Sequence, residues 1–162
     1  MFNLTRAKLV LGIPPLLILI FFASTWFSYS ARGFNVRLEI TGLNIVEGRM
    51  SRLLEEGRFR GGIPSDLRLS AVVIGIGGIA ALTLALFMSP IGRWAYTGIG
   101  AVVGVALLNI VGQLGVDINP SFTTSTDLAV WIITAAAIAM IGLGIFYPSL
   151  QAMLDQPAQN AA

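Results

Sequence analysis

Four apolar runs, each about 20 residues long and free of charged residues, divide this chain of 162 residues. They cover residues 9–29, 69–88, 94–114 and 128–147. A helix rises ~1.5 Å per residue, so each run can cross a hydrocarbon core of about 30 Å. Only 11% of the residues are charged and 56% are hydrophobic, which leaves too little charge to cover a soluble domain. We therefore predict a single all-α membrane domain, residues 1–162, with four transmembrane helices.

Most of the charge lies in one segment, residues 30–68, between the first two apolar runs. This segment holds seven of the ten basic residues and five of the eight acidic residues. Apolar and polar residues alternate strictly over residues 34–41, which is typical of a half-buried strand. Asn44 and Glu47 then have the spacing of a helix-capping box, and apolar residues follow at helical spacing up to Gly57. We predict a folded polar loop that contains one strand and one helix.

The ends of the chain suggest an orientation. Arg6 and Lys8 precede the first run, which we expect to be retained as a signal anchor, with Trp26, Phe27 and Tyr29 as an aromatic belt at its far end. Four spans place both termini on one side of the membrane, and the tail, residues 149–162, is expected to be flexible.

Basic residues favour the cytoplasmic side, so Arg6, Lys8 and Arg93 predict cytoplasmic termini in a prokaryotic cytoplasmic (inner) membrane. By count, the seven arginines of residues 30–68 favour the opposite orientation. We prefer cytoplasmic termini because the first anchor usually sets the orientation.

The third run carries small and amide side chains that predict helix packing. Gly100, Gly104 and Gly112 allow close approach of a neighbouring helix, either within the bundle or at a dimerisation face. Asn109 and Gln113 are four residues apart and therefore share one helix face. Amides at such positions usually form hydrogen bonds between helices, and the alternative is contact with a lipid headgroup, a quinone or a pigment.

The residue types present argue against catalysis. The chain has no cysteine and no histidine, which excludes disulfides, zinc–thiolate sites and histidine acid–base chemistry. Glu55 and Glu56 form the only adjacent acidic pair, and neighbours on a helix diverge by ~100°, so they do not face one substrate. No charged residue lies inside an apolar run, where proton relays and ion carriers need one. We predict no enzyme activity, no cofactor and no metal.

The charged residues of the loop point instead to recognition of proteins. Their signs are mixed, which suits complementary protein surfaces, and a net charge of +2 is too small to favour nucleic acid. The residues expected to bind a partner are Arg49, Arg52, Glu55, Glu56, Arg58 and Arg60. We interpret the chain as a non-catalytic accessory subunit of a larger membrane protein complex. It would contact the lipid bilayer and other membrane subunits, docking through residues 30–68 and through small-residue helix faces.

The order of a short N-terminal segment, a long first loop with strand and helix, a tight second turn and a small third loop is similar to that of claudins and peripheral-myelin tetraspans. Residues 41–44, Thr-Gly-Leu-Asn, are the nearest fragment to the W-x-G-L-W motif of that family, and the motif itself and its paired cysteines are absent. The resemblance covers topology and implies one alternative, a self-associating homo-oligomer. A second alternative is a small lipid- or quinone-binding protein that uses the Asn109 and Gln113 face.

Overall fold

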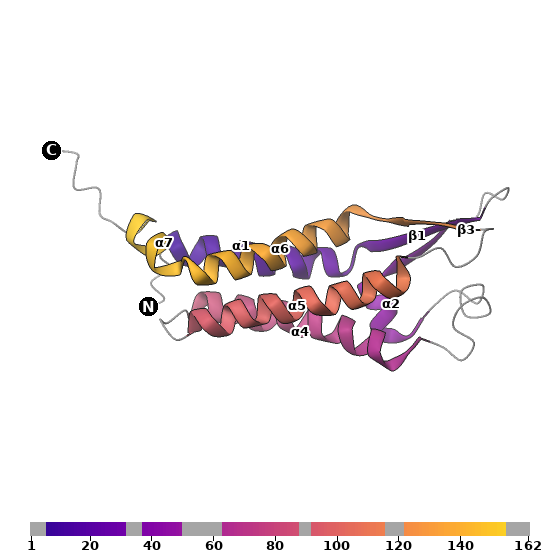
Figure 1. Ribbon diagram of the computed structural model, residues 1–162, viewed down its shortest axis with the longest axis horizontal. Coiled ribbons are helices and arrows are strands. Elements are labelled where there is room, and N and C mark those ends of the chain that lie inside the picture. The colour runs from indigo at the N-terminus through magenta and orange to yellow at the C-terminus, as the bar shows by residue number, and fades with distance from the viewer. Residues whose placement is uncertain (1–5, 32–36, 50–62, 88–91, 116–121, 155–162) are drawn as a thin grey trace.

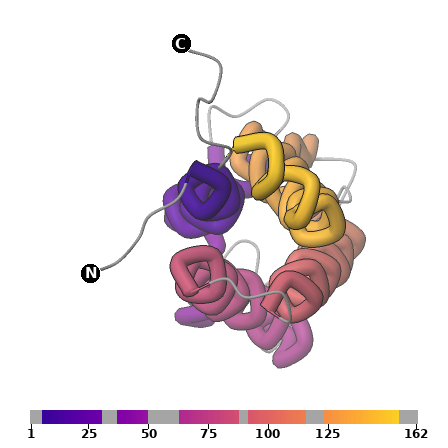
Figure 2. The backbone as a smooth tube through the Cα atoms, turned by 90° about the vertical axis from the view of Figure 1, so that its left-hand side faces the viewer, coloured from indigo at the N-terminus to yellow at the C-terminus, as the bar shows by residue number. Residues whose placement is uncertain are grey.

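The described part of the chain is mostly helical. The computed structural model describes residues 6–31, 37–49, 63–87, 92–115 and 122–154. Neighbouring long helices run antiparallel along one axis (Figure 1). Seen down that axis they form a ring, in which each helix packs against the next and the last packs against the first (Figure 2). In ring order these are α1 (Arg6–Phe22), α4 (Ser65–Leu86), α5 (Gly92–Leu114) and α6 (Leu128–Ile145).

Three of these helices, α4, α5 and α6, are long and apolar enough to cross a membrane, which indicates a membrane protein. Many of their large apolar side chains point outward, such as Ile76, Leu108 and Ile138, each more than half exposed. Helix α1 has 17 residues, or ~25 Å at about 1.5 Å per residue. It is shorter than the run predicted over residues 9–29 because that run changes from helix to strand after Phe22.

The predicted all-α fold with one strand in its polar loop is confirmed in part: at one end of the bundle the described residues form three strands instead of one. Three strands form an antiparallel sheet in the order β2-β1-β3, and the sheet lies at the end of the bundle away from helix α7 (Figure 1). The strands are β1 (Thr25–Ala31), β2 (Arg37–Thr41) and β3 (Phe122–Thr126). Threonine and aromatic residues are favoured in strands, and β1 has a partner on each side, so backbone pairing with both neighbours outweighs continuation of the helix.

The aromatic residues of β1 form part of the core. Trp26, Phe27 and Tyr29 are each 0% exposed, so the expected belt at the membrane boundary is wrong for these residues. The Tyr29 hydroxyl donates a hydrogen bond of 2.6 Å to the carbonyl oxygen of Leu114 at the end of α5. Strand β1 therefore ties the sheet to the helix that lies across the ring from α1.

The strand predicted from alternation corresponds to β2, of which residues 37–41 are described. The following helix, α2 (Gly42–Glu47), starts earlier than expected: Thr41 is the N-cap, and its Oγ1 accepts a hydrogen bond of 3.1 Å from the amide nitrogen of Asn44. It ends at Gly48, whose φ of 72° lies in the left-handed region that favours glycine. A helix continuing through Gly48 to Gly57 is therefore wrong at Gly48, and residues 50–62 lie outside the described part.

A short helix, α7 (Tyr147–Leu154), follows α6 and packs against α1. The predicted flexible tail, residues 149–162, is thus helical over its first part. Helix α7 and the start of α1 lie at the same end of the bundle, opposite the sheet (Figure 1). At this end Tyr96 links α5 to α1, because its hydroxyl donates to the carbonyl oxygen of Leu11 at 2.6 Å. Tyr29 links β1 to α5 in the same way at the other end.

Candidate functional site

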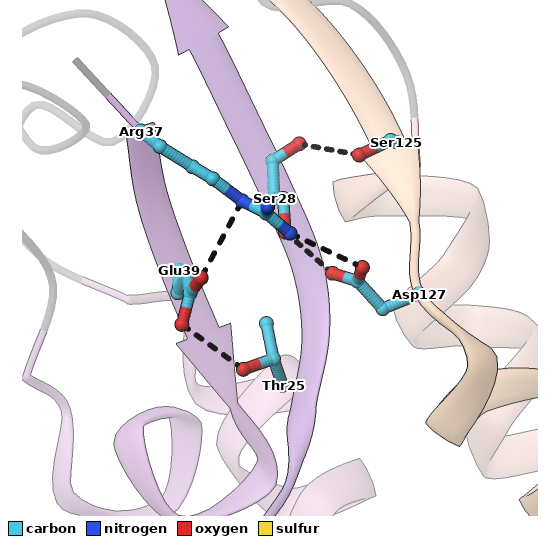
Figure 3. Close-up of polar contacts among 6 residues, drawn as sticks. All are labelled: Thr25, Ser28, Arg37, Glu39, Ser125 and Asp127. Carbon is cyan, nitrogen blue, oxygen red and sulfur yellow. Dashed lines mark hydrogen bonds and ion pairs between the residues drawn. The ribbon is translucent and has the colours of Figure 1, made fainter. Parts of the chain in front are cut away.

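The sheet carries a polar network centred on Arg37 of β2 (Figure 3). Its Nη2 donates to the Ser28 hydroxyl at 2.9 Å and lies 3.6 Å from Oδ1 of Asp127. Its Nε lies 3.4 Å from Oε1 of Glu39 on the same strand. The Ser28 hydroxyl in turn donates to Oδ2 of Asp127 at 2.5 Å. Arg37 therefore links β2, the central strand β1 and the residue that precedes α6.

Two further hydroxyl groups complete this sheet network. Thr25 donates to Glu39 at 3.2 Å, and Ser125 of β3 donates to the carbonyl oxygen of Ser28 at 3.3 Å. Ser28 is 1% exposed, whereas the side chains of Arg37 and Glu39 are 59% and 52% exposed. Exposed ion pairs add little stability, ~0–1 kcal/mol each. The network therefore fixes how the strands and α6 meet, and its acidic and hydroxyl groups are engaged with one another.

Of the residues expected to bind a partner, Arg49 lies in the described part. Its side chain is 80% exposed, and its Nε lies 3.4 Å from Oε2 of Glu47. It follows Gly48, and it is Gly48 that lies against the guanidinium group of Arg68 on α4. Five others lie outside the described residues: Arg52, Glu55, Glu56, Arg58 and Arg60.

The three glycines of α5 are placed differently from one another. A Cβ atom at Gly100 would lie 2.9 Å from Cβ of Met140 and 3.1 Å from the carbonyl oxygen of Ala137, so α5 and α6 meet closely there. A Cβ atom at Gly104 or Gly112 would meet nothing within 4 Å. Of the two uses considered above, packing within the bundle fits Gly100 and does not extend to Gly104 and Gly112.

Asn109 and Gln113 connect α5 to α4. The Asn109 amide donates to the Ser70 hydroxyl at 2.9 Å. Nε2 of Gln113 donates to Oδ2 of Asp66 at 2.6 Å and to Oδ1 of Asn109 at 3.0 Å. We call these four residues the amide ladder: Asp66, Gln113, Asn109 and Ser70. The ladder runs from the first turn of α4, near the sheet, toward the middle of the bundle.

On the side of the amide ladder away from the sheet, an apolar groove runs between α4 and α5 on the outer surface of the bundle. The part next to Ser70 and Asn109 has a volume of about 590 Å³. A second part of about 430 Å³ continues from it, and the two share Val73 and Val102. The groove is floored further along by small residues, Gly77, Ala80, Ala95 and Gly98.

Within the described residues, no group of three or more His, Cys, Asp or Glu side chains is placed to hold a metal ion. No protein-family model matches the chain. The sequence also matches no curated protein.

The sequence did not predict a role for several residues of the sheet network and the amide ladder. Asp127 directly precedes an apolar run, a common position for a helix cap, and this could have marked it. Its carboxylate makes no cap bond to α6, because Ser28 and Arg37 use it instead. Asp66 and Ser70 lie one turn apart at the start of α4, but no signal pairs them with amides on α5.

Proposed function

We propose that this protein spans the bilayer four times and is a non-catalytic accessory subunit of a larger membrane protein complex. Helix α1 would be the remaining span. It lies in the ring between α4 and α6, and its outward side chains Leu9, Ile13 and Ile20 are each more than half exposed. A helix of ~25 Å falls a few Å short of a hydrocarbon core of about 30 Å, a mismatch that local thinning of the bilayer accommodates at modest cost.

Cytoplasmic termini form part of the proposal. Arg6, Lys8 and Arg93 lie at the end of the bundle where α1 and α5 begin. The described acidic residues, by contrast, lie at the sheet end, on β2, α2, the first turn of α4 and just before α6. Among the described residues, that end carries basic side chains and no acidic ones, and basic residues favour the cytoplasmic side.

The outward ridge of α5 carries the proposal for docking. Gly104, Leu108 and Gly112 are spaced by four residues and form one ridge, which we call the docking ridge. Leu108 is 70% exposed, and neither glycine has a neighbour within 4 Å of an added Cβ. Small residues at this spacing let another membrane helix approach closely. At the sheet end, exposed Arg49 and the charged loop would add charge complementarity with the partner.

The test is native mass spectrometry of the protein released from its own membranes in mild detergent. We expect a partner chain at fixed stoichiometry, lost or sharply reduced when Gly104 and Gly112 are both changed to Leu, and reduced when Arg49 and Arg52 are both changed to Glu. Gly142→Leu is the matched control, because Gly142 on α6 also has no neighbour within 4 Å of an added Cβ. Recovery of the chain alone, or undiminished partner in both double variants, would overturn the proposal.

A homo-oligomer is the second candidate. The docking ridge supports it as well, because small residues four apart also serve self-association of membrane helices. The same measurement separates the two: copies of this chain without other polypeptides would favour self-association, with the Gly104→Leu/Gly112→Leu variant reduced to the monomer.

A further inference from the structure

Arg93, in the first turn of α5, carries a positive charge that no described residue neutralises. Its Nε is buried and has no hydrogen-bond partner. Within the described part of the chain, no acidic side chain forms an ion pair with it. Its guanidinium group lies instead over the ring of Trp94, with Cζ 5.1 Å from the ring centroid. Removing a cation from water without a counter-ion is costly, so this group should bind an anion.

The position of Arg93 on α5 places this group at the end of the bundle core. Buried residues recur along α5 at spacings of three and four, from Tyr96 through Gly100 to Val103. Arg93 extends this stripe by three residues toward the start of the helix. Its guanidinium group turns toward Trp94, which is 60% exposed. The residue is partly exposed although its Nε is buried, so an anion can reach it from the surface through the two Nη groups.

Exposed tryptophan side chains mark the two boundaries of the apolar outer surface. Trp94 lies near the start of α5 and Trp131 near the start of α6, and these helices run antiparallel, so the two lie at opposite ends of the bundle (Figure 1). They are 60% and 64% exposed. Phe87 after α4 and Phe146 after α6 are also exposed at the end that holds Trp94. Tryptophan favours the level of the lipid headgroups, so Arg93 lies at the depth of their phosphate groups.

The other charges at this end also favour an anionic ligand. The Tyr96 hydroxyl is bonded to the carbonyl oxygen of Leu11, so α1 and α5 are level at these residues. Lys8 and Arg93 each lie about one turn nearer the end of the bundle, and Arg6 lies beyond Lys8 on α1. The described acidic residues all lie at the sheet end. A negative group at Arg93 therefore meets attraction without a described carboxylate to oppose it.

A lipid phosphate group meets these conditions. The guanidinium group presents parallel N–H donors that match two phosphate oxygens. A free phosphate ion offers the same oxygens but gains nothing from the apolar surface beside Trp94. A phospholipid is held by its acyl chains against that surface and presents its phosphate group at the right depth. A lipid with a net negative charge fits better than a zwitterionic one, whose ammonium group Lys8 and Arg6 would repel.

We propose that Arg93 binds the phosphate group of an anionic phospholipid in the leaflet at the end of the bundle opposite the sheet. The ring of Trp94 supports the guanidinium group, and Lys8 and Arg6 add attraction at longer range. This inference rests on the membrane-spanning part of the proposed function and not on the partner complex. Gly104, the nearest residue of the docking ridge, lies ~16 Å farther along α5 at about 1.5 Å per residue.

Native mass spectrometry of the purified protein in mild detergent tests the proposal with three lipids that have the same acyl chains: phosphatidylglycerol, phosphatidylcholine and diacylglycerol. We expect phosphatidylglycerol to bind at least about fivefold more tightly than phosphatidylcholine, the preference expected from one arginine near a membrane surface. Diacylglycerol, which has no phosphate group, should bind least. Inorganic phosphate in excess should not displace phosphatidylglycerol. Equal binding of the three lipids, or displacement by inorganic phosphate, would overturn the proposal.

Variants of Arg93 locate the site. Arg93→Gln should weaken binding of phosphatidylglycerol at least about fivefold. Arg93→Lys keeps the charge and loses the paired donors, so it should bind more weakly than the unchanged protein and still prefer phosphatidylglycerol. Arg49→Gln is the matched control, because it removes the same charge from a side chain that is 80% exposed and paired with Glu47 near the sheet.

Two results with these variants would contradict the proposal. One is equal binding of phosphatidylglycerol by Arg93→Gln and Arg49→Gln. The other is loss of a partner polypeptide, with lipid binding unchanged, when Arg93→Gln is released from its own membranes, which would assign the guanidinium group to a protein carboxylate. Failure of the partner complex alone would leave the lipid measurements on the purified chain as they are, so the two proposals fail separately.

Discussion

Helix α5 meets its two neighbours by different means. Toward α6 it makes close apolar contact at Gly100, and Gly144 of α6 packs against Thr97 and the carbonyl oxygen of Arg93. Toward α4 it makes close contact at Gly77 and is also bridged by the amide ladder nearer the sheet. The groove lies on the second side. Close packing fills an interface, whereas bridging by long amide side chains holds two helices in place and leaves room on their outer surface.

The largest expected effect is on the α5–α6 side. Gly100→Ala would place a Cβ atom 2.9 Å from Cβ of Met140, so the helices must separate. Overpacking of this kind costs ~1–3 kcal/mol. We expect a lower midpoint of thermal unfolding in detergent. Gly104→Ala is the control, because nothing lies within 4 Å of its added Cβ and Ala favours a helix over Gly. Equal midpoints for the two variants would mean that α5 and α6 are not closely packed at Gly100.

The amide ladder should contribute less to the stability of the bundle than the close contact at Gly100. Asn109→Leu removes the bonds to Ser70 and from Gln113, and hydrogen bonds between membrane helices are worth ~0.6–2 kcal/mol each. We expect a modest drop in unfolding midpoint with the bundle retained. A matched substitution on the same helix, Leu108→Ala, alters an outward side chain that is 70% exposed and should change the midpoint less. A loss as large as that of Gly100→Ala would remove the contrast between the two sides.

A smaller change isolates one bond of the ladder. Ser70→Ala removes the hydroxyl that accepts from Asn109 and leaves the Gln113–Asp66 bond in place. We expect the free energy of unfolding to fall by ~0.6 kcal/mol, the average for hydrogen bonds between membrane helices. A double-mutant cycle with Asn109→Leu measures the coupling directly. Strict additivity of the two losses would show that Ser70 and Asn109 do not interact.

The smallest effect is expected at the exposed edge of the sheet. Arg37→Gln removes an ion pair with Glu39, in which both side chains are about half exposed, and one with Asp127, whose side chain is 26% exposed. Exposed pairs of this kind contribute ~0–1 kcal/mol. The difference from the unchanged protein should shrink as salt rises, because screening weakens exposed charges. Ser28→Ala gives the comparison, because Ser28 is 1% exposed and hydrogen-bonded to Asp127. Ser28→Ala should lower the free energy of unfolding more than Arg37→Gln does, and this decrease should not depend on salt. A larger, salt-independent loss for Arg37→Gln would show that the guanidinium group acts as a buried group.

The sequence by itself predicted that lipid surrounds most of this protein and where its long helices lie. Apolar runs without charges indicated helices in lipid, and α4, α5 and α6 follow three of these runs closely. Alternation over residues 34–41 located β2. The amide spacing of Asn109 and Gln113 placed both on one face of α5. These features are local, since hydropathy and periodicity depend on neighbours in the chain.

Only the tertiary structure decided the rest. Residues 25–29 belong to the first apolar run and were expected to continue its helix. They become part of strand β1 because β2, which follows it closely in the chain, and β3, which is distant in sequence, pair with its two edges. The same holds for Gly100 and Gly104, which are equivalent by spacing and differ because α6 lies over one of them. Asp66 and Ser70 acquired partners only when α4 came to lie beside α5. In each case part of the deciding free energy comes from a contact between segments far apart in the chain, as between β1 and β3, which no local pattern encodes.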